Sequence, residues 1–224
     1  MLIDQDSGDY ISLVGVRTIV FDMDGTIIDS KDAYMGTLLE ALESYGFRRE
    51  DVEGLIVPSI RGTVERILRE DEELVTGIEL KIRKDIVKRA DGVDLCPGAL
   101  SVLGLVGRYK LGLMTGSPLA FVEKVLSKYD LGDVFDQIIT VDQDFSSKED
   151  KYVHILKLLQ TDPGETVLVG DTKSDVRVAK GTGSRSVAVY NEYSWSWPHK
   201  EQLIELEPDL IVTSIEEFVS NCLG

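Results

Sequence analysis

The sequence predicts an α/β fold in which a parallel β-sheet carries an inserted block of helices. Short apolar runs alternate with helical patterns from Pro97 onward, which is typical of a parallel sheet with helices on both faces. One further apolar run precedes them, and the segment between, residues 30–93, has helical spacing. With 224 residues, the chain has room for one sheet and a modest insertion.

The first strand is expected at Thr18–Phe21, an apolar run rich in β-branched and aromatic residues. It opens into Asp22-Met23-Asp24-Gly25-Thr26, at the carboxyl end of the strand, where open α/β sheets bind ligands. Two carboxylates this close repel each other unless a cation or a shared proton lies between them. A divalent cation resolves the repulsion, and oxygen ligands favour Mg²⁺. The alternative is a solvated turn, because Asp and Gly are common turn residues.

Residues 30–93 contain two amphipathic stripes and are expected to form helices that pack on each other. The first stripe consists of Tyr34, Leu38, Leu42 and Tyr45, and the second of Leu74, Ile78, Ile82 and Ile86. An insertion directly after the first strand starts from the carboxyl edge of the sheet. We therefore predict a helical cap over that edge.

Five further strands are expected at residues 110–115, 138–141, 166–170, 185–189 and 209–212. Helical patterns separate them, so the strands are expected to run parallel. The segment Gly181-Thr182-Gly183 follows a helix instead of a strand. It is interpreted as a helix terminator and not as a dinucleotide-binding loop.

Polar groups follow two of these strands. Thr115-Gly116-Ser117 offers a hydroxyl and a backbone amide that suit a phosphate oxygen. Gly170-Asp171 and Asp175 add a second pair of carboxylates near the start of a helix, and Lys148 lies between the two groups. Taken singly, these are typical of a loop, a helix cap and a surface lysine. Their order on successive strand ends favours one shared site.

Together, four segments resemble the motifs of the haloacid dehalogenase superfamily: Asp22-x-Asp24-Gly25-Thr26, Thr115-Gly116-Ser117, Lys148 and Gly170-Asp171-x-x-x-Asp175. Within it, the chain is similar to the phosphatase branch that includes phosphoglycolate phosphatases and β-phosphoglucomutases. The resemblance extends from about residue 16 onward, and its first and fourth motifs are the most specific. It implies a Rossmann-like core, residues 1–29 and 94–224, and a small helical cap domain, residues 30–93.

The resemblance implies a role for each carboxylate. Asp22 would be the nucleophile that forms an acyl phosphate, and Asp24 the acid that protonates the leaving oxygen and then the base that activates water. Mg²⁺ would be held by the Asp22 carboxylate, the Asp24 backbone carbonyl and Asp171. Asp175 and Thr26 would support the site from outside this ligand set.

The phosphoryl oxygens would be bound by Thr115, the Gly116 amide and Ser117, together with a lysine. Lys148 is preferred for that lysine, because one helix and one strand fit between it and the next strand end. Lys151 is the alternative.

The expected function is a Mg²⁺-dependent phosphatase that hydrolyses a small phosphorylated metabolite, similar to phosphoglycolate or a sugar phosphate. Asp24 favours phosphoryl chemistry over dehalogenation, because expelling a halide requires no proton. A phosphomutase and a binding or regulatory module with vestigial activity remain as alternatives. A phosphonatase would need a cap lysine as Schiff-base amine, for which Lys31, Lys81, Lys84 and Lys88 are available.

The composition excludes some partners. With 24 basic and 40 acidic residues, the net charge of −16 disfavours nucleic acid and anionic membranes, so an anionic substrate must be attracted locally. Cys96 and Cys222 have no disulfide-framework or metal-site spacing, which favours a reducing compartment. The start Met1–Asp6 lacks signal-peptide features, and no apolar run is long enough to span a membrane. We expect a cytoplasmic monomer or homodimer.

Other conspicuous residues have weaker functional interpretations. Arg61, beside a glycine in the cap, is the cap residue most expected to contact an anionic substrate, with a solvated helix start as the alternative. His154 and His199 do not lie on strand ends, so no catalytic role is expected. Trp195 and Trp197 are expected to pack, with a place on the rim of the cleft as the alternative.

Overall fold

The fold is built on one six-stranded parallel sheet. The computed structural model describes residues 14–52, 55, 57, 59–68 and 71–223, so the expectation for Met1–Asp6 lies outside the described residues. The strands are β1 (Thr18–Asp22), β4 (Lys110–Met114), β5 (Gln137–Ile139), β6 (Thr166–Gly170), β7 (Arg185–Val189) and β8 (Leu210–Val212). Their order is β5-β4-β1-β6-β7-β8, and every neighbouring pair is parallel.

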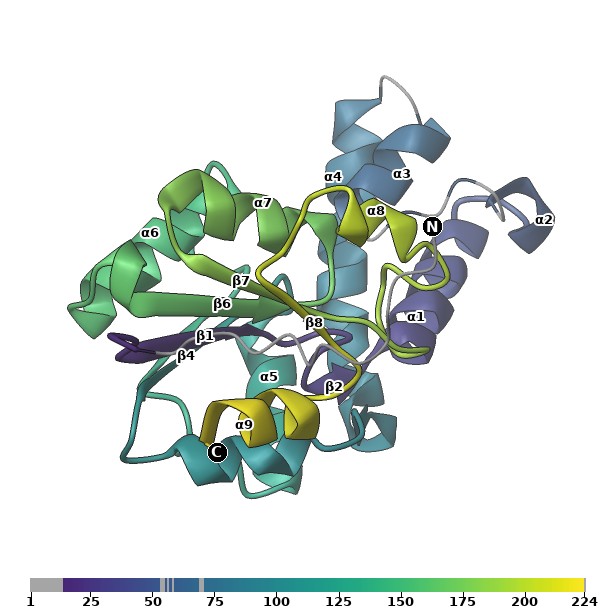
Figure 1. The fold of residues 1–224 in the computed structure, drawn as a ribbon. Helices are drawn as coiled ribbons and strands as arrows, with labels where there is room; N and C mark the ends of the chain where they lie inside the picture. The colour runs from purple at the N-terminus through teal and green to yellow at the C-terminus, as the bar shows by residue number, and fades with distance from the viewer. Residues whose placement is uncertain (1–13, 53–54, 56, 58, 69–70, 224) are drawn as a thin grey trace.

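Helices cover both faces of this sheet (Figure 1). On one side lie α6 (Lys148–Leu159) and α7 (Lys173–Thr182), and on the other α5 (Leu119–Lys128) and α9 (Ile215–Leu223), with the 3₁₀ segment η2 (Ala99–Leu105) packed against α9. Side chains of β1 alternate between the two cores: Ile19 and Phe21 belong to the larger, Val20 to the smaller. A strand buried on both faces explains the continuous apolar run in the sequence.

The segment between the first two core strands is helical, as predicted. It contains α1 (Lys31–Glu43), α2 (Arg49–Val52), α3 (Ile60–Leu68), α4 (Glu72–Asp85) and the 3₁₀ segment η1 (Ile86–Gly92), which we call the cap helices. Short antiparallel strands, β2 (Ile28–Asp29) and β3 (Asp94–Leu95), pair where the chain leaves and re-enters the core. The division into two domains at residues 29/30 and 93/94 stays a prediction.

Two details of the predicted stripes are wrong. Tyr45 lies beyond the end of α1, in a turn, and is 44% exposed, because Gly46 at φ +88° and the Phe47 amide close the helix early. Ile86 is buried but begins η1 instead of ending α4. The remaining stripe residues lie on α1 and α4, and Leu38, Leu42, Ile78 and Ile82 are buried.

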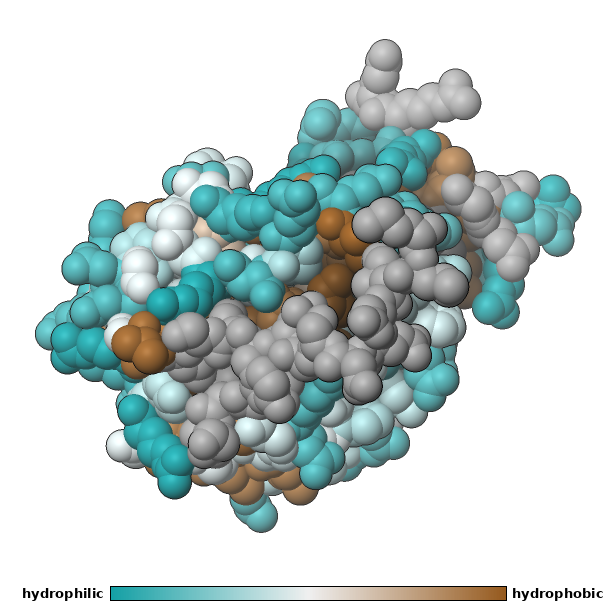
Figure 2. Space-filling model, in the orientation of Figure 1, coloured by the Kyte–Doolittle hydropathy of each residue, from teal (hydrophilic) through white to brown (hydrophobic). Residues whose placement is uncertain are grey.

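The predicted strands are confirmed to within two residues at their ends. Gly183 ends α7 with φ +85°, which confirms the Gly-Thr-Gly segment as a helix terminator. Among residues 14–223, apart from the gaps named above, no helix is both long and apolar enough to cross a membrane. Hydrophilic residues dominate the described part of the face shown in Figure 2, which agrees with the large net charge.

The strand order creates a topological switch beside β1. The chain runs from β1 to β4 and β5 on one side, then crosses back to β6, β7 and β8 on the other. In open α/β sheets such a crossing leaves a crevice at the carboxyl ends of the central strands. The first polar residues beyond β1, β4 and β6 therefore meet at one place.

Candidate active site

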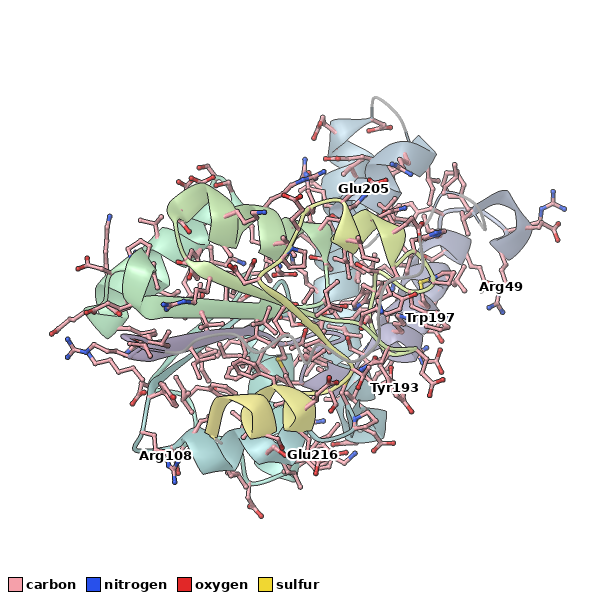
Figure 3. The ribbon with its side chains drawn as sticks, viewed as in Figure 1. Arg49, Arg108, Tyr193, Trp197, Glu205 and Glu216 are labelled. Carbon is pink, nitrogen blue, oxygen red and sulfur yellow. The ribbon has the colours of Figure 1, made fainter. Side chains whose placement is uncertain are left out.

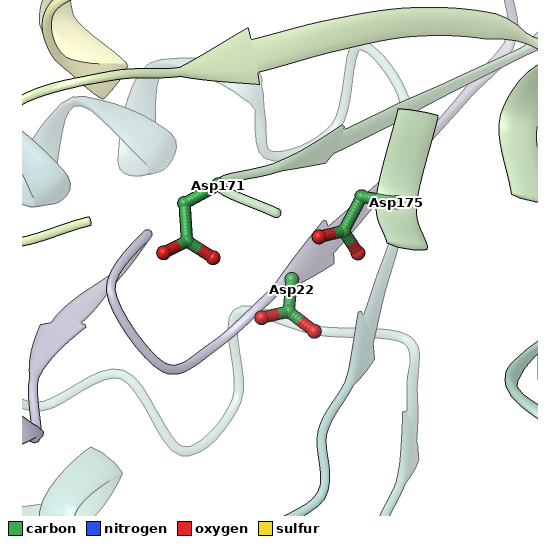
Figure 4. Close-up of side chains that lie close together, drawn as sticks. All are labelled: Asp22, Asp171 and Asp175. Atoms are coloured by element: carbon green, nitrogen blue, oxygen red, sulfur yellow. The ribbon is translucent and has the colours of Figure 1, made fainter. Parts of the chain in front are cut away.

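Three buried carboxylates converge at this edge of the sheet. Asp22 ends β1, Asp171 follows β6 directly, and Asp175 lies in the first turn of α7. Each offers one oxygen within 4.8 Å of the others, and their side chains point toward one another (Figure 4). The exposed fractions are 7%, 0% and 1%, so these charges are withdrawn from water.

Lys148, the first residue of α6, joins two of the three carboxylates. Its Nζ donates to Asp22 Oδ1 at 3.0 Å and forms an ion pair with Asp175 Oδ1 at 2.6 Å. Asp175 also closes a capping box at the start of α7, where its Oδ2 accepts from the Thr172 amide at 3.0 Å and from the Thr172 hydroxyl. Asp175 is therefore held in place from two sides and orients Lys148.

The charges in this cluster do not balance. If all three carboxylates were ionised, one ammonium would leave an excess of two negative charges out of water. Burial raises the pKa of Asp22 to about 7 against the lowering effect of Lys148, and burial with Asp22 and Asp175 raises the pKa of Asp171 well above its usual range. Burial alone lowers the pKa of Lys148, but Asp175 and Asp22 raise it overall. The cluster favours an added cation.

Asp171 has an oxygen free for such a cation. Its Oδ2 accepts a hydrogen bond from the Trp195 backbone amide, whereas its Oδ1 is buried and has no hydrogen-bond donor among the residues that the structure describes. A buried carboxylate oxygen without a donor is costly unless a cation meets it. The all-oxygen donor set fits a hard divalent cation.

Asp24 faces a different set of partners. Its Oδ2 accepts from Thr115 Oγ1 at 2.7 Å and from Ser117 Oγ at 2.9 Å. The loop has already turned at this point, because Gly25 adopts φ +78° directly after Asp24. Asp22 and Asp24 thus serve two adjoining parts of the site.

Thr115 and its neighbours lie where the sequence predicts, directly after β4. In this structure the Thr115 hydroxyl donates to Asp24, so it must turn to bind a phosphoryl oxygen. Gly116 is exposed and lines the cleft, with room beside its Cα. The Thr26 side chain is fully buried, and its Oγ1 has no partner in the described part of the chain.

The site opens into a cleft of about 600 Å³ between the core and the cap helices. The core wall contains Asp22, Asp24, Gly116, Lys148 and Lys151, and the cap wall contains Tyr34, Ser59, Ile60, Arg61 and Glu79. The cleft therefore has reactive groups on one wall and mixed charged and apolar groups on the other.

The two candidate lysines differ in their contacts. Lys148 reaches the carboxylate cluster, whereas Lys151 Nζ donates to the Thr115 carbonyl at 2.9 Å. Partial burial and the nearby Lys148 lower the pKa of Lys151 to about 8. Among the described residues, no carboxylate lies within ion-pair distance of Lys151. It is a half-buried ammonium that faces the cleft and lacks an anionic partner.

Arg61 lies in the first turn of α3 and lines the cleft, but its guanidinium is already engaged. It donates to Glu65 at 2.7 Å, to Glu72 at 3.0 Å and to Glu79 at 3.1 Å. Glu79 also accepts from Arg83. An anionic substrate would have to compete with these carboxylates for Arg61.

The histidines and tryptophans are only partly as predicted. His154 packs on Phe145 with ring centroids 5.2 Å apart, His199 is exposed near Glu201, and neither lines the cleft. Trp197 lies at the outer side of the loop after β7 (Figure 3), 48% exposed and against the Tyr190 ring. Trp195 lines the cleft, which favours the alternative of a rim position for this residue.

Three contributions were not visible in the sequence. Tyr34 fits an apolar stripe, yet its hydroxyl enters the site. The Trp195 backbone amide donates a hydrogen bond to Asp171. Glu79 lines the cap wall. A backbone amide carries no sequence signal. Tyr34 and Glu79 satisfy helical patterns equally well with or without a role in a site.

Solved structures with the same fold include bacterial hydrolases. A haloacid dehalogenase-like family hydrolase from Streptococcus pneumoniae is 20% identical, with a TM-score of 0.77 over 92% of this chain and 98% of that chain. A structure described as a predicted phosphatase from Clostridium acetobutylicum is 23% identical, with a TM-score of 0.79 over 92% and 97% of the two chains. At this identity, the likeness establishes the fold.

The family follows from the sequence match. The model of the haloacid dehalogenase-like hydrolases matches residues 19–189, and the chain belongs to this family of hydrolytic enzymes. The protein named pyrophosphatase PpaX from Bacillus mycoides (strain KBAB4) is similar, with 27% identity over 213 residues that cover 91% of this chain and 95% of the relative.

Proposed function

We propose that this chain is a Mg²⁺-dependent phosphatase that hydrolyses a small phosphorylated metabolite through an aspartyl phosphate on Asp22. The observation that carries the proposal is the position of Asp22: a strand-end carboxylate, paired with Lys148, at the base of a cleft. Its neighbours supply the other requirements of phosphoryl transfer, which are charge neutralisation and a separate proton carrier. Membership of the hydrolase family supports the same reaction.

The chain's own residues divide the reaction into two steps. Asp22 attacks phosphorus in line with the leaving oxygen, which takes a proton from Asp24. In the second step Asp24 takes a proton from water, which attacks phosphorus; the bond from phosphorus to the Asp22 oxygen breaks, and phosphate and the Asp22 carboxylate are released. Lys148 and the Gly116 amide bind the phosphoryl oxygens, and Thr115 joins them once its hydroxyl leaves Asp24.

Asp22, Asp171 and the Asp24 backbone carbonyl would hold Mg²⁺, which supplies charge neutralisation at the phosphoryl group when it is bound. The free, buried Oδ1 of Asp171 and the excess negative charge of the cluster support this assignment. Asp175 is less suited to a direct contact, because Thr172 and Lys148 already engage its oxygens.

The substrate is expected to be small and strongly anionic. A cleft of about 600 Å³ admits a compact metabolite, and the unpaired ammonium of Lys151 favours a substrate with charge beyond the reacting group. Because relatives are named pyrophosphatases, inorganic diphosphate belongs among the first compounds to test, beside phosphoglycolate and sugar phosphates.

The alternatives receive less support. None of the four lysines considered for a phosphonatase lines the cleft: Lys81 and Lys88 pair with Asp85, and Lys31 donates to the Glu192 carbonyl. A phosphomutase uses the same aspartyl phosphate and differs in its product. The cytoplasmic location and the choice between monomer and homodimer stay predictions.

Phosphate release from a panel of phosphorylated metabolites tests the proposal. Activity should disappear with a chelator and return with Mg²⁺, because the buried carboxylates then lose and regain their counterion. Full turnover in excess chelator would contradict the metal assignment. An isomerised sugar phosphate without released phosphate would indicate the mutase instead.

A further inference from the structure

A chain of hydrogen bonds connects the cap to the Asp24 carboxylate. The hydroxyl of Tyr34, on cap helix α1, lies 2.6 Å from Ser117 Oγ, and Ser117 Oγ donates to Asp24 Oδ2 at 2.9 Å. A serine hydroxyl has one proton to donate. Because Ser117 donates that proton to Asp24, Tyr34 must be the donor to Ser117.

The donors around Asp24 all end on the same oxygen. Thr115 Oγ1 donates to Oδ2 as well, at 2.7 Å, and the Ser117 amide donates to Thr115 Oγ1 at 2.9 Å. The other oxygen, Oδ1, is buried and receives no hydrogen bond within the described ranges. When the Thr115 hydroxyl turns to a phosphoryl oxygen, as the proposed function requires, the hydrogen bond from Ser117 to Oδ2 continues to fix the orientation of the Asp24 carboxylate.

The packing of Tyr34 holds its hydroxyl in place as the donor to Ser117. Tyr34 is 7% exposed, and its ring packs edge-on against Phe121 of core helix α5 and against Trp195, with centroids 5.9 and 6.4 Å away. Burial, and after it the Asp24 charge, raise the pKa of Tyr34 well above its usual range, so the phenol keeps the proton that it donates. The cap thereby holds a permanent donor against the core.

We propose that Tyr34 is a positioning residue: through Ser117, it fixes the orientation in which the Asp24 carboxylate exchanges its proton with the leaving group. This inference rests on the proposed function, in which Asp24 is the acid and base. Because α1 begins two residues after β2, where the chain passes from core to cap, a displacement of the cap moves Tyr34 with it. The position of the cap is then transmitted to the residue that moves the proton.

Tyr34→Phe tests the inference, because it removes the hydroxyl and keeps the ring. The measurement is single-turnover phosphoenzyme formation with aryl and alkyl phosphates of graded leaving-group pKa. With alkyl substrates, the rate of phosphoenzyme formation should fall by about tenfold or more. This is part of the roughly 10²–10⁴-fold rate acceleration that a positioned acid contributes. With a nitrophenyl substrate, whose leaving group departs without a proton, the same rate should fall by less than about twofold. The rate should therefore depend more steeply on leaving-group pKa.

Tyr152→Phe is the matched control. Tyr152 is also fully buried and donates to a serine, Ser184 Oγ at 2.8 Å, in the core and outside the cleft lining. Both variants lose one buried tyrosine–serine hydrogen bond, so their melting temperatures should fall by similar amounts. The leaving-group dependence should change in Tyr34→Phe and stay at the wild-type value in Tyr152→Phe.

Ser117→Ala supplies a second measurement on the same chain of hydrogen bonds. The double variant with Tyr34→Phe should form the phosphoenzyme from alkyl phosphates as fast as Ser117→Ala alone, because both changes break the same chain of hydrogen bonds to Asp24. Additive losses, or a uniform loss of Tyr34→Phe on all leaving groups, would overturn the positioning role. Failure of the proposed function would give a different result. The wild type would then form no phosphoenzyme with any substrate, which would overturn both the proposed function and the positioning role of Tyr34.

Discussion

The two walls of the cleft are built in opposite ways. On the core wall, Asp22 is nearly inaccessible to water and shares Lys148 with Asp175, which lies behind the wall, so that three elements of the fold meet at one lysine. On the cap wall, the Arg61 side chain is 44% exposed and pairs with carboxylates of its own region. Buried charges fixed from several sides keep their geometry, whereas exposed ion pairs exchange partners and contribute little.

This difference suggests a division of roles, in which the core wall carries out the reaction and the cap wall selects the substrate. In the proposed mechanism, the charges of the core wall act in the transition state, so changes there should reduce the rate for every substrate. The cap wall holds groups that a substrate can displace, so changes there should alter which substrate binds. The first three predictions below test the two sides of this division, and the last tests an ion-pair cluster of the cap helices away from the cleft; they are given in order of decreasing effect.

Asp22→Asn should have the largest effect. The amide keeps the shape of the side chain but cannot attack phosphorus, so turnover should fall by several orders of magnitude, as in other enzymes that lose a covalent nucleophile. Steady-state kinetics on an aryl phosphate measures the loss, and mass spectrometry checks that the phosphoenzyme is absent. A variant that retains a tenth of the wild-type turnover would rule Asp22 out.

Lys148→Met and Lys151→Met should differ strongly. Lys148 contacts Asp22, the proposed nucleophile, so its loss should lower kcat/KM by roughly 10²–10³-fold on every substrate, the range for removing one charge-stabilising group. Lys151 Nζ donates to a backbone carbonyl and has no ion pair among the described residues, so its loss should chiefly raise KM, by up to about tenfold, and most for substrates with a second anionic group. Equal effects of the two changes would show that both lysines bind the transferred phosphoryl group.

Arg61→Ala should change specificity and leave the chemistry intact. For a small neutral leaving group, kcat should stay within about twofold, and stability should change by about 1 kcal/mol or less, because the Arg61 side chain is 44% exposed and water screens its ion pairs. KM for anionic metabolites should rise. Arg66→Ala, exposed on the same helix and absent from the cleft lining, is the control. If both variants behave alike, the cap wall does not select substrates through Arg61.

Asp85→Asn should affect stability alone, and only above strongly acidic pH. Hydrogen bonds from Lys81 and Lys88 lower the pKa of Asp85 from 3.8 to about 2. A carboxyl whose pKa is lower in the folded state stabilises the protein above pH 3.8, and that contribution is lost as the pH falls through about 2. Thermal unfolding should show a small deficit of the variant near neutral pH that shrinks in acid. A deficit independent of pH would mean that the ion pairs contribute nothing.

The sequence by itself determined the elements and the approximate place of the site. The six strands of the parallel sheet were visible as apolar runs, because a strand buried on both faces requires such a run, whereas the two-residue strands β2 and β3 were not predicted. The residues after β1, β4 and β6 could be grouped because parallel strands bring their carboxyl ends to one edge. The match of the family model to residues 19–189 confirms the family that the four motifs indicated. The roles of the individual residues stay predictions.

The tertiary structure alone decided how those residues face one another. Lys148 meets Asp22 across 126 positions of sequence. The spacing to the next strand end favoured Lys148 over Lys151, but it could not show which of the two reaches Asp22. Asp24 turns toward Thr115 and Ser117 because the backbone reverses at Gly25, whose φ of +78° a strand pattern does not encode. Tyr34 looked like any apolar residue of a helix stripe. Its role in the site depends on where α1 packs against the core, and that packing is set by the fold as a whole.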